Sequence, residues 1–65
     1  MASRRDELLS VEDVLRELGG VSIRTFYRWR ELGRAPKGLR LPNNELRIWR
    51  SELMEWLESL REDAA

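Results

Sequence analysis

The sequence predicts a mainly α-helical domain with a small β-hairpin, in the order helix, turn, helix, hairpin, helix. Two apolar stripes with i, i+3, i+4, i+7 spacing indicate two helices that each bury one face. These stripes are Val11, Val14, Leu15 and Leu18 near the start and Leu53, Trp56, Leu57 and Leu60 near the end. Between them, Pro36 and Pro42 exclude a continuous helix, and the residues around Pro42 alternate in character with the period of a strand.

The first helix has recognisable signals at both ends. Ser10 is the expected N-cap, and Asp13 three residues later makes a weaker form of the capping box. Leu9, just before this cap, is placed to contact Val14 one turn into the helix. The glycine pair at positions 19–20 ends the helix, because glycine adopts the left-handed conformation that a C-cap needs.

The second helix is expected from about Ile23 to Leu32, with Ser22 as its N-cap and Gly33 as its stop. Only the residues around positions 20 and 21 separate it from the first helix. A turn this short forces a steep crossing, which is the helix-turn-helix geometry, rather than an antiparallel pair.

A hairpin is expected after the second helix, with strands at residues 38–41 and 45–49 joined by Pro42-Asn43-Asn44. Two strands are too few to be stable alone, so they must pack on the helices. Ser51 is the expected N-cap of the third helix.

The expected boundaries are a flexible arm over residues 1–7, one domain over residues 8–61 and a flexible tail over residues 62–65.

Composition excludes most catalytic chemistry. The 65 residues include no cysteine and no histidine, so disulfides, thiolate-bound metals and the commonest general base are all absent. We therefore expect no enzyme, no cofactor and no metal site. No apolar run approaches the roughly 20 residues of a membrane span, and MASRRDELLS has no hydrophobic signal core, so we expect a cytoplasmic protein without membrane contact.

Charge is strongly segregated although the net charge is zero. Residues 1–23 have three cations against five acids, residues 24–50 have eight against two, and residues 51–65 have one against five. Such an acid–base–acid layout indicates a binding face for an anionic partner. The alternative is a solvated surface whose charges happen to be segregated.

The second helix separates its aromatic and cationic residues onto two faces at 100° per residue. Its inward positions are Ser22, Ile23, Phe26, Trp29 and Gly33. Its outward positions are Arg24, Arg28 and Glu31, flanked by Thr25 and Tyr27. Arg30 falls near the inward face, with its stem along the core and its head reaching out.

An outward arginine pair on a short helix fits the edges of DNA bases, because guanidinium presents a flat fork of donors. The candidates for major-groove contact are Arg24, Thr25, Tyr27 and Arg28. Ser22 and the free backbone N–H groups at the helix start are candidates for holding a phosphate. Glu31 argues against this interpretation unless it pairs with Arg28 or Arg34, and a solvated face remains the alternative.

The hairpin supplies further cations. The candidates for contact with the DNA backbone are Arg34, Lys37, Arg40 and Arg47. A basic hairpin beside such a helix is able to reach a neighbouring minor groove. The alternative is a charged strand edge that prevents sheet aggregation.

The run LLSVEDVLRELGGVSIRTFYRWRELGRAPK resembles the excisionase-type winged helix-turn-helix domains, which are relatives of the DNA-binding domain of the mercury-resistance regulator (MerR). The matching motifs are Leu9-Ser10, Gly20-Val21-Ser22, Thr25 to Trp29, Gly33-Arg34-Ala35-Pro36, Arg47-Ile48, Glu52-Leu53 and Trp56-Leu57. The resemblance covers about residues 8–60. The sequence departs from the family pattern at Arg30, where an apolar residue is common, and at Asn43-Asn44, where glycines are common.

The resemblance implies a protein that binds double-stranded DNA, with the second helix in the major groove and the hairpin, or wing, along an adjacent minor groove. It implies an excisionase, or recombination directionality factor, that bends attachment-site DNA and helps a tyrosine or serine integrase in excision. It also implies cooperative self-association on DNA and a bacterial or phage-encoded, nucleoid-associated protein. The alternatives are a stand-alone transcriptional regulator with the same domain and, from another class, a protein-interaction module that uses Trp56 and Leu57.

Overall fold

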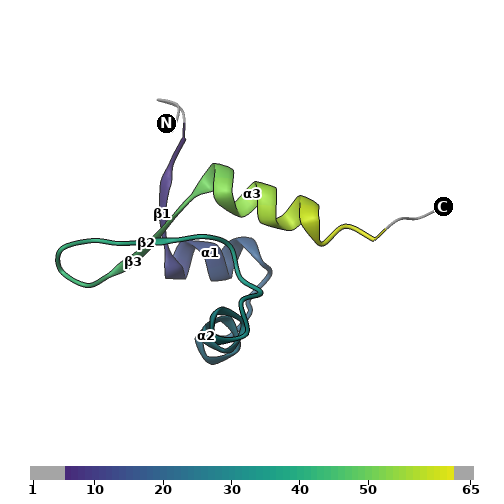
Figure 1. Ribbon diagram of the computed structural model, residues 1–65, viewed down its shortest axis with the longest axis horizontal. Helices are drawn as coiled ribbons and strands as arrows, with labels where there is room; N and C mark the ends of the chain where they lie inside the picture. Colours follow the sequence, from purple (N-terminus) through teal and green to yellow (C-terminus); the bar gives the residue numbers. More distant parts are fainter. Residues whose placement is uncertain (1–5, 63–65) are drawn as a thin grey trace.

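Three short helices and a three-stranded antiparallel sheet form the fold in the computed structural model, which describes residues 6–62 (Figure 1). The elements in chain order are β1 (Leu8–Ser10), α1 (Val11–Glu17), α2 (Ile23–Glu31), β2 (Leu39–Arg40), β3 (Leu46–Trp49) and α3 (Arg50–Ser59). The parts of the predicted arm and tail at residues 1–5 and 63–65 lie outside the described residues.

The sheet contains one more strand than the predicted hairpin. Its order is β1-β3-β2, with Leu9 opposite Ile48 and Arg40 opposite Leu46. The expected hairpin of β2 and β3 is confirmed, but β1 was not predicted. A strand of three residues carries too little alternation to be detected locally, and it exists because β3 offers it a pairing edge.

The predicted ends of α1 are confirmed. The Ser10 side chain accepts a hydrogen bond from the Asp13 backbone, and the Asp13 side chain accepts one from the Ser10 backbone, which completes the capping box. At the other end, Gly19 and Gly20 have φ values of 85° and 96°. The Gly20 N–H donates to the Leu15 carbonyl at 3.0 Å, as in a Schellman motif.

Helix α2 also begins and ends as predicted. The Ser22 side chain accepts a hydrogen bond from the Thr25 N–H, and Gly33 follows the helix with φ 71°. The Arg34 N–H donates to the Trp29 carbonyl at 2.8 Å, so this end too has the Schellman pattern.

Helix α3 begins differently from the prediction. Its N-cap is Trp49, which makes no side-chain cap hydrogen bond, and Ser51 already lies within the helix. The missing cap is replaced from the other end of the chain, because the Asp6 carboxylate accepts from the Ser51 N–H at 2.9 Å and from its hydroxyl. Glu7 adds an ion pair with Arg50 at 2.6 Å, so residues 6 and 7 of the predicted arm contact α3.

The connection between β2 and β3 covers residues 41–45 and is longer than the predicted turn of Pro42-Asn43-Asn44. The Asn44 N–H donates to the Leu41 carbonyl at 2.8 Å, and Asn44 has φ 70°, which asparagine tolerates in a turn. Gly38 lies close to β3, because a Cβ added to it would be 3.0 Å from Leu46 and 3.2 Å from the Arg47 carbonyl oxygen.

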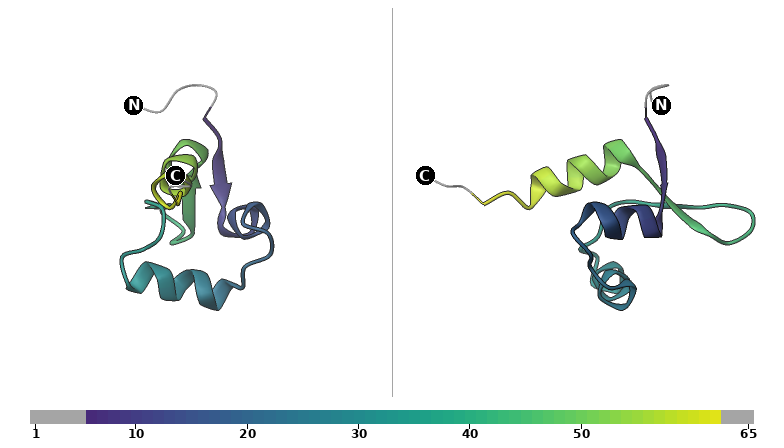
Figure 2. Two further views of the ribbon diagram at one scale, coloured as in Figure 1. Left: turned by 90° about the vertical axis from the view of Figure 1, so that its right-hand side faces the viewer. Right: turned by 180° about the vertical axis from the view of Figure 1, so that it is seen from behind.

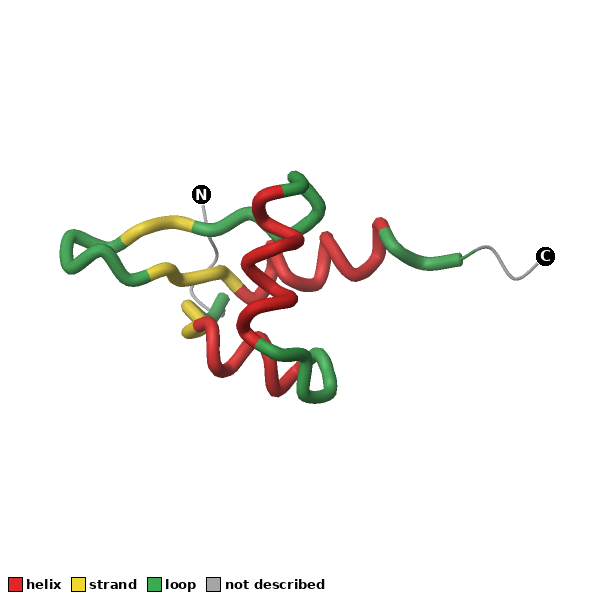
Figure 3. Tube along the Cα trace, turned by 90° about the horizontal axis from the view of Figure 1, so that it is seen from below, coloured by secondary structure: helices red, strands yellow, loops and turns green. Residues whose placement is uncertain are grey.

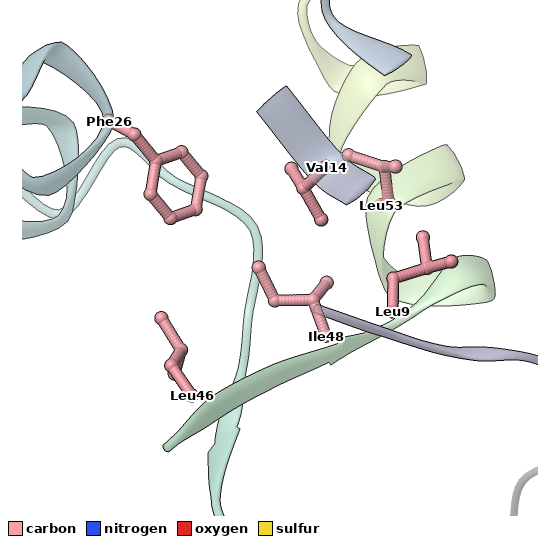
Figure 4. Close-up of a cluster of buried hydrophobic side chains, with 6 residues drawn as sticks. All are labelled: Leu9, Val14, Phe26, Leu46, Ile48 and Leu53. Atoms are coloured by element: carbon pink, nitrogen blue, oxygen red, sulfur yellow. The ribbon is translucent and has the colours of Figure 1, made fainter. Parts of the chain in front are cut away.

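One apolar core joins the helices to the sheet (Figure 4). Its buried members come from β1, α1, α2, β3 and α3 and are Leu9, Val14, Phe26, Leu46, Ile48 and Leu53. Leu9 and Val14, which were expected to contact each other, both belong to this core. Trp29 is half-buried and packs against it. Ile23 was predicted to face inward, but 52% of it is exposed, because the first turn of α2 extends beyond the core.

Candidate nucleic-acid interface

The outer side of α2 is uncovered by the rest of the described chain. Figure 2 shows α2 at one extreme of the molecule, and Figure 3, seen from below, shows it in front of the other elements. Phe26 is 0% exposed and anchors the opposite side of the helix in the core. Both Arg24 and Arg28 are exposed, and neither makes an ion pair among residues 6–62. The structure therefore places two uncompensated guanidinium groups on the outer side of α2, as the sequence predicted.

Ser22 and Thr25 form a closed hydroxyl pair at the start of α2. The Ser22 hydroxyl donates to Thr25 Oγ1 at 2.9 Å and also accepts from the Thr25 N–H at 3.2 Å. Thr25 is half-buried. The pair fixes the first turn of the helix, so its first role is structural.

Tyr27 points from α2 toward the hairpin. Its ring packs edge-on against Phe26, with centroids 5.9 Å apart and an interplanar angle of 77°. It remains 37% exposed and lines a hollow of about 460 Å³ between α2 and the hairpin. Arg40, Asn44 and Arg47 line the same hollow from the hairpin side. The structure thus brings Tyr27 and two of the predicted hairpin cations together.

The two hairpin arginines differ in how freely they present their charge. Arg40 is exposed and donates to the Asn44 carbonyl at 2.9 Å, a neutral partner that leaves its charge uncompensated. Arg47 has a side chain only 26% exposed and forms an ion pair with Glu45 at 2.6 Å. Its charge is therefore already compensated by Glu45. Its limited exposure fits its place on β3, the middle strand of the sheet.

Asp13 directly follows Glu12, which lines this hollow, and its pKa is lowered. Hydrogen bonds from the Ser10 backbone and side chain hold the pKa of Asp13 below its usual value, and the charges of Arg16 and Arg47 act in the same direction.

Arg34 and Lys37 lie away from the hollow that Tyr27 lines. Lys37 faces α3, where it lines a hollow of about 180 Å³ together with Glu52 and Glu55. Arg34 lies where the end of α2 meets α3. The cations predicted for one interface therefore divide among the outer side of α2, the hairpin hollow and the α3 side.

Three polar residues near the candidate interface were not assigned a role at that interface from the sequence. Glu12 lines the hairpin hollow with Tyr27, although in the sequence it looks like an ordinary first-turn acid of α1. The Asn44 carbonyl accepts a hydrogen bond from Arg40. In the sequence Asn44 is recognisable only as a turn residue, and it does adopt the left-handed conformation. Glu45 lies just before β3 and neutralises Arg47, which is two positions further along the chain.

Comparisons of the chain with models of known protein families, with curated proteins and with solved structures found no match. No helix in the described part of the chain has both the length and the apolar character needed to cross a membrane. Among residues 6–62, no group of three or more acidic side chains is arranged to hold a metal ion.

Proposed function

We propose that the chain is a winged helix-turn-helix protein that binds double-stranded DNA. In this proposal α1 and α2 form the helix-turn-helix, α2 enters the major groove, and the β2–β3 hairpin is the wing. The outer side of α2 makes the base contacts, through Arg24 and Arg28. Guanidinium groups pair with guanine O6 and N7 in the major groove and with phosphate oxygens beside it.

One observation carries the proposal: Arg24 and Arg28 are exposed and unpaired on the side of α2 that lies opposite the buried Phe26. The fold contains acids within reach of other arginines, as at Glu45–Arg47 and Glu7–Arg50. Charges left uncompensated on one helix face are best explained by an anionic partner from outside the chain.

The wing contributes mainly through Arg40. Its guanidinium is exposed beside the turn and its charge is uncompensated, so it supports a contact with a phosphate next to the groove that α2 occupies. Tyr27 lines the same hollow as this arginine and supports a contact with the same strand of DNA. Ser22 and Thr25 contribute by capping the first turn of α2.

The finer proposal is an excisionase that assembles on attachment-site DNA and assists an integrase. The acidic surface of α3, with Glu55 and Glu58 exposed, supports contact with the basic surface of a neighbouring copy on DNA. A transcriptional regulator with the same domain is the alternative, because the DNA-binding surface would be the same in both.

Fluorescence anisotropy with labelled duplexes tests the proposal. We expect specific binding to duplexes from the attachment or promoter regions that flank the gene, and the affinity should fall as salt rises. Footprints over repeated attachment sites, with bent DNA, indicate an excisionase, whereas a footprint over a promoter alone indicates a regulator. A chain that binds no duplex even at low salt contradicts the proposal in both forms.

A further inference from the structure

A second surface lies where the end of α2 meets α3, apart from the hairpin hollow. It is a groove of about 300 Å³, lined by Arg28, Trp29, Leu32, Arg34, Trp56 and Leu60. Four of these six residues are apolar or aromatic, and two are arginines. The groove therefore combines an apolar floor with cationic edges.

Two packed tryptophans form the floor of the groove, and two exposed leucines form its walls. The Trp29 and Trp56 rings lie 6.0 Å apart at 41°, and the Trp56 Nε1–H donates to the Arg34 carbonyl at 3.1 Å. Leu32 and Leu60 are 57% and 54% exposed, the largest fractions among the large apolar residues that the structure describes. Apolar side chains gathered along one groove mark an interaction site, whereas scattered ones do not.

The cations at the edges of the groove select the charge of its occupant. Neither Arg28 nor Arg34 forms an ion pair among residues 6–62, and they share this with the other cations that no acid of the described chain compensates, which are Arg24, Arg30, Lys37 and Arg40. An occupant must therefore supply carboxylates beside apolar side chains. DNA supplies the negative charge without the apolar side chains, so it matches only half of this surface.

We propose that the groove binds an acidic amphipathic helix of a partner protein. Its apolar side chains would cover Leu32, Leu60 and the two tryptophans, and its carboxylates would pair with Arg28 and Arg34. This is the helix-in-groove mode of peptide recognition, in which anchors recur at i, i+3, i+4 and i+7. The surface thus differs in chemistry and place from the hollow beside the hairpin.

Arg28 connects the groove to DNA binding, and this part of the inference rests on the proposed function. The same guanidinium lies on the outer side of α2 and lines the groove. A carboxylate paired with Arg28 removes it from the DNA, so the partner helix and the duplex bind antagonistically. By linkage, the helix weakens DNA binding by the same factor by which DNA weakens helix binding.

NMR titration of the full isotope-labelled chain tests the groove. The probe is a synthetic helical peptide with leucines at i, i+3, i+4 and i+7 and glutamates between them, and the control is the same peptide with lysines in place of the glutamates. The indole N–H signals of Trp29 and Trp56 should shift with the glutamate peptide. The Leu60→Glu variant should lose at least about fivefold in affinity. Its matched control is Met54→Glu, a 42% exposed residue of α3 outside the groove, which should bind normally.

The outcomes separate clearly once circular dichroism shows that both variants are folded. Equal binding of both peptides, equal loss in both variants or no shift at the groove overturns the proposal. Shifts of Leu32 and Leu60 that depend on protein concentration alone, without peptide, assign the groove to a second copy and also overturn it. Peptide binding in a chain that binds no duplex leaves the groove standing and contradicts only the proposed function. Peptide binding that leaves duplex affinity unchanged overturns the antagonism.

Discussion

Asp6 lies beside Ser51, and its carboxylate accepts hydrogen bonds from the Ser51 N–H at 2.9 Å and from the Ser51 hydroxyl. The two residues are 45 positions apart in the chain. This contact satisfies backbone donors at the start of α3, which has no side-chain cap of its own. Glu7, which follows Asp6 and precedes β1, adds a second contact with α3, because the Arg50 Nε–H donates to its carboxylate.

The Asp6–Ser51 contact should make the free energy of unfolding depend on pH in the acid range. The hydrogen bond from the Ser51 side chain is the main cause that lowers the pKa of Asp6 below its ordinary value of 3.8. The unfolded chain therefore binds more protons than the folded one below about pH 4, and stability should fall as the pH drops through the folded pKa. Asp6→Asn should lower the melting temperature at neutral pH, and its difference from the wild type should shrink as the pH falls below the ordinary carboxyl pKa of 3.8.

Melting curves by circular dichroism across this pH range measure the effect of Asp6→Asn. The matched control is Glu55→Gln, an exposed acid that makes no hydrogen bond among the described residues. A constant difference between Asp6→Asn and the wild type at every pH would show that the carboxylate charge has no part in the contact.

Phe26→Ala should destabilise the fold much more than Ile23→Ala, although both residues belong to α2. Phe26 is 0% exposed, so its truncation leaves a cavity and should cost about 3–5 kcal/mol. Ile23 is 52% exposed, and its truncation should cost less than about 1 kcal/mol. Urea unfolding measures both values. Equal costs would mean that the core does not include α2 in the way the structure shows.

Arg24→Ala and Arg28→Ala should each weaken binding to the specific duplex by about 1–3 kcal/mol and relax base preference at one position. Both side chains are exposed, so the fold should be unaffected. The control is Arg61→Ala, whose side chain is 77% exposed just after α3 and pairs with Glu58. Anisotropy against a set of single-base variants of the duplex measures both effects. Unchanged affinity in Arg28→Ala would refute the assignment of the outer side of α2.

Arg40→Ala and Glu45→Gln should change non-specific DNA binding in opposite directions. Arg40 presents an uncompensated charge, so its loss should weaken all duplexes alike and reduce the salt slope by about one. Glu45 neutralises Arg47 at 2.6 Å, so Glu45→Gln should release that arginine and strengthen binding to any duplex. Titrations at several salt concentrations measure both slopes. The same direction of change in both variants would show that the hairpin does not contact phosphates.

Local signals in the sequence were sufficient for α1 and α2 and for the ends of these two helices. The Ser10 and Ser22 caps and the glycines that follow α1 and α2 act within a few residues, so their effects can be predicted without knowing the rest of the fold. The exposure of Arg24 and Arg28 follows in the same way, because helix geometry places them opposite the apolar Phe26.

Features that depend on contacts between distant segments of the chain could not be predicted from local sequence patterns. Strand β1 exists only through its pairing with β3, and the start of α3 is capped by Asp6 rather than by Ser51. In the sequence Arg47 looked like a free hairpin cation, yet Glu45 holds it. Proximity in space decides each of these contacts, and the local pattern does not report it.

The sequence by itself therefore determined the order of the helices and hairpin and the outward arginines of α2, because periodicity and capping are interactions between near neighbours. Only the tertiary structure decided which cations stay uncompensated and which share a hollow. It also decided that Trp29 and Trp56 meet to form a groove. The physical reason is that an ion pair or a groove is made between elements, and its existence depends on how the core brings those elements together.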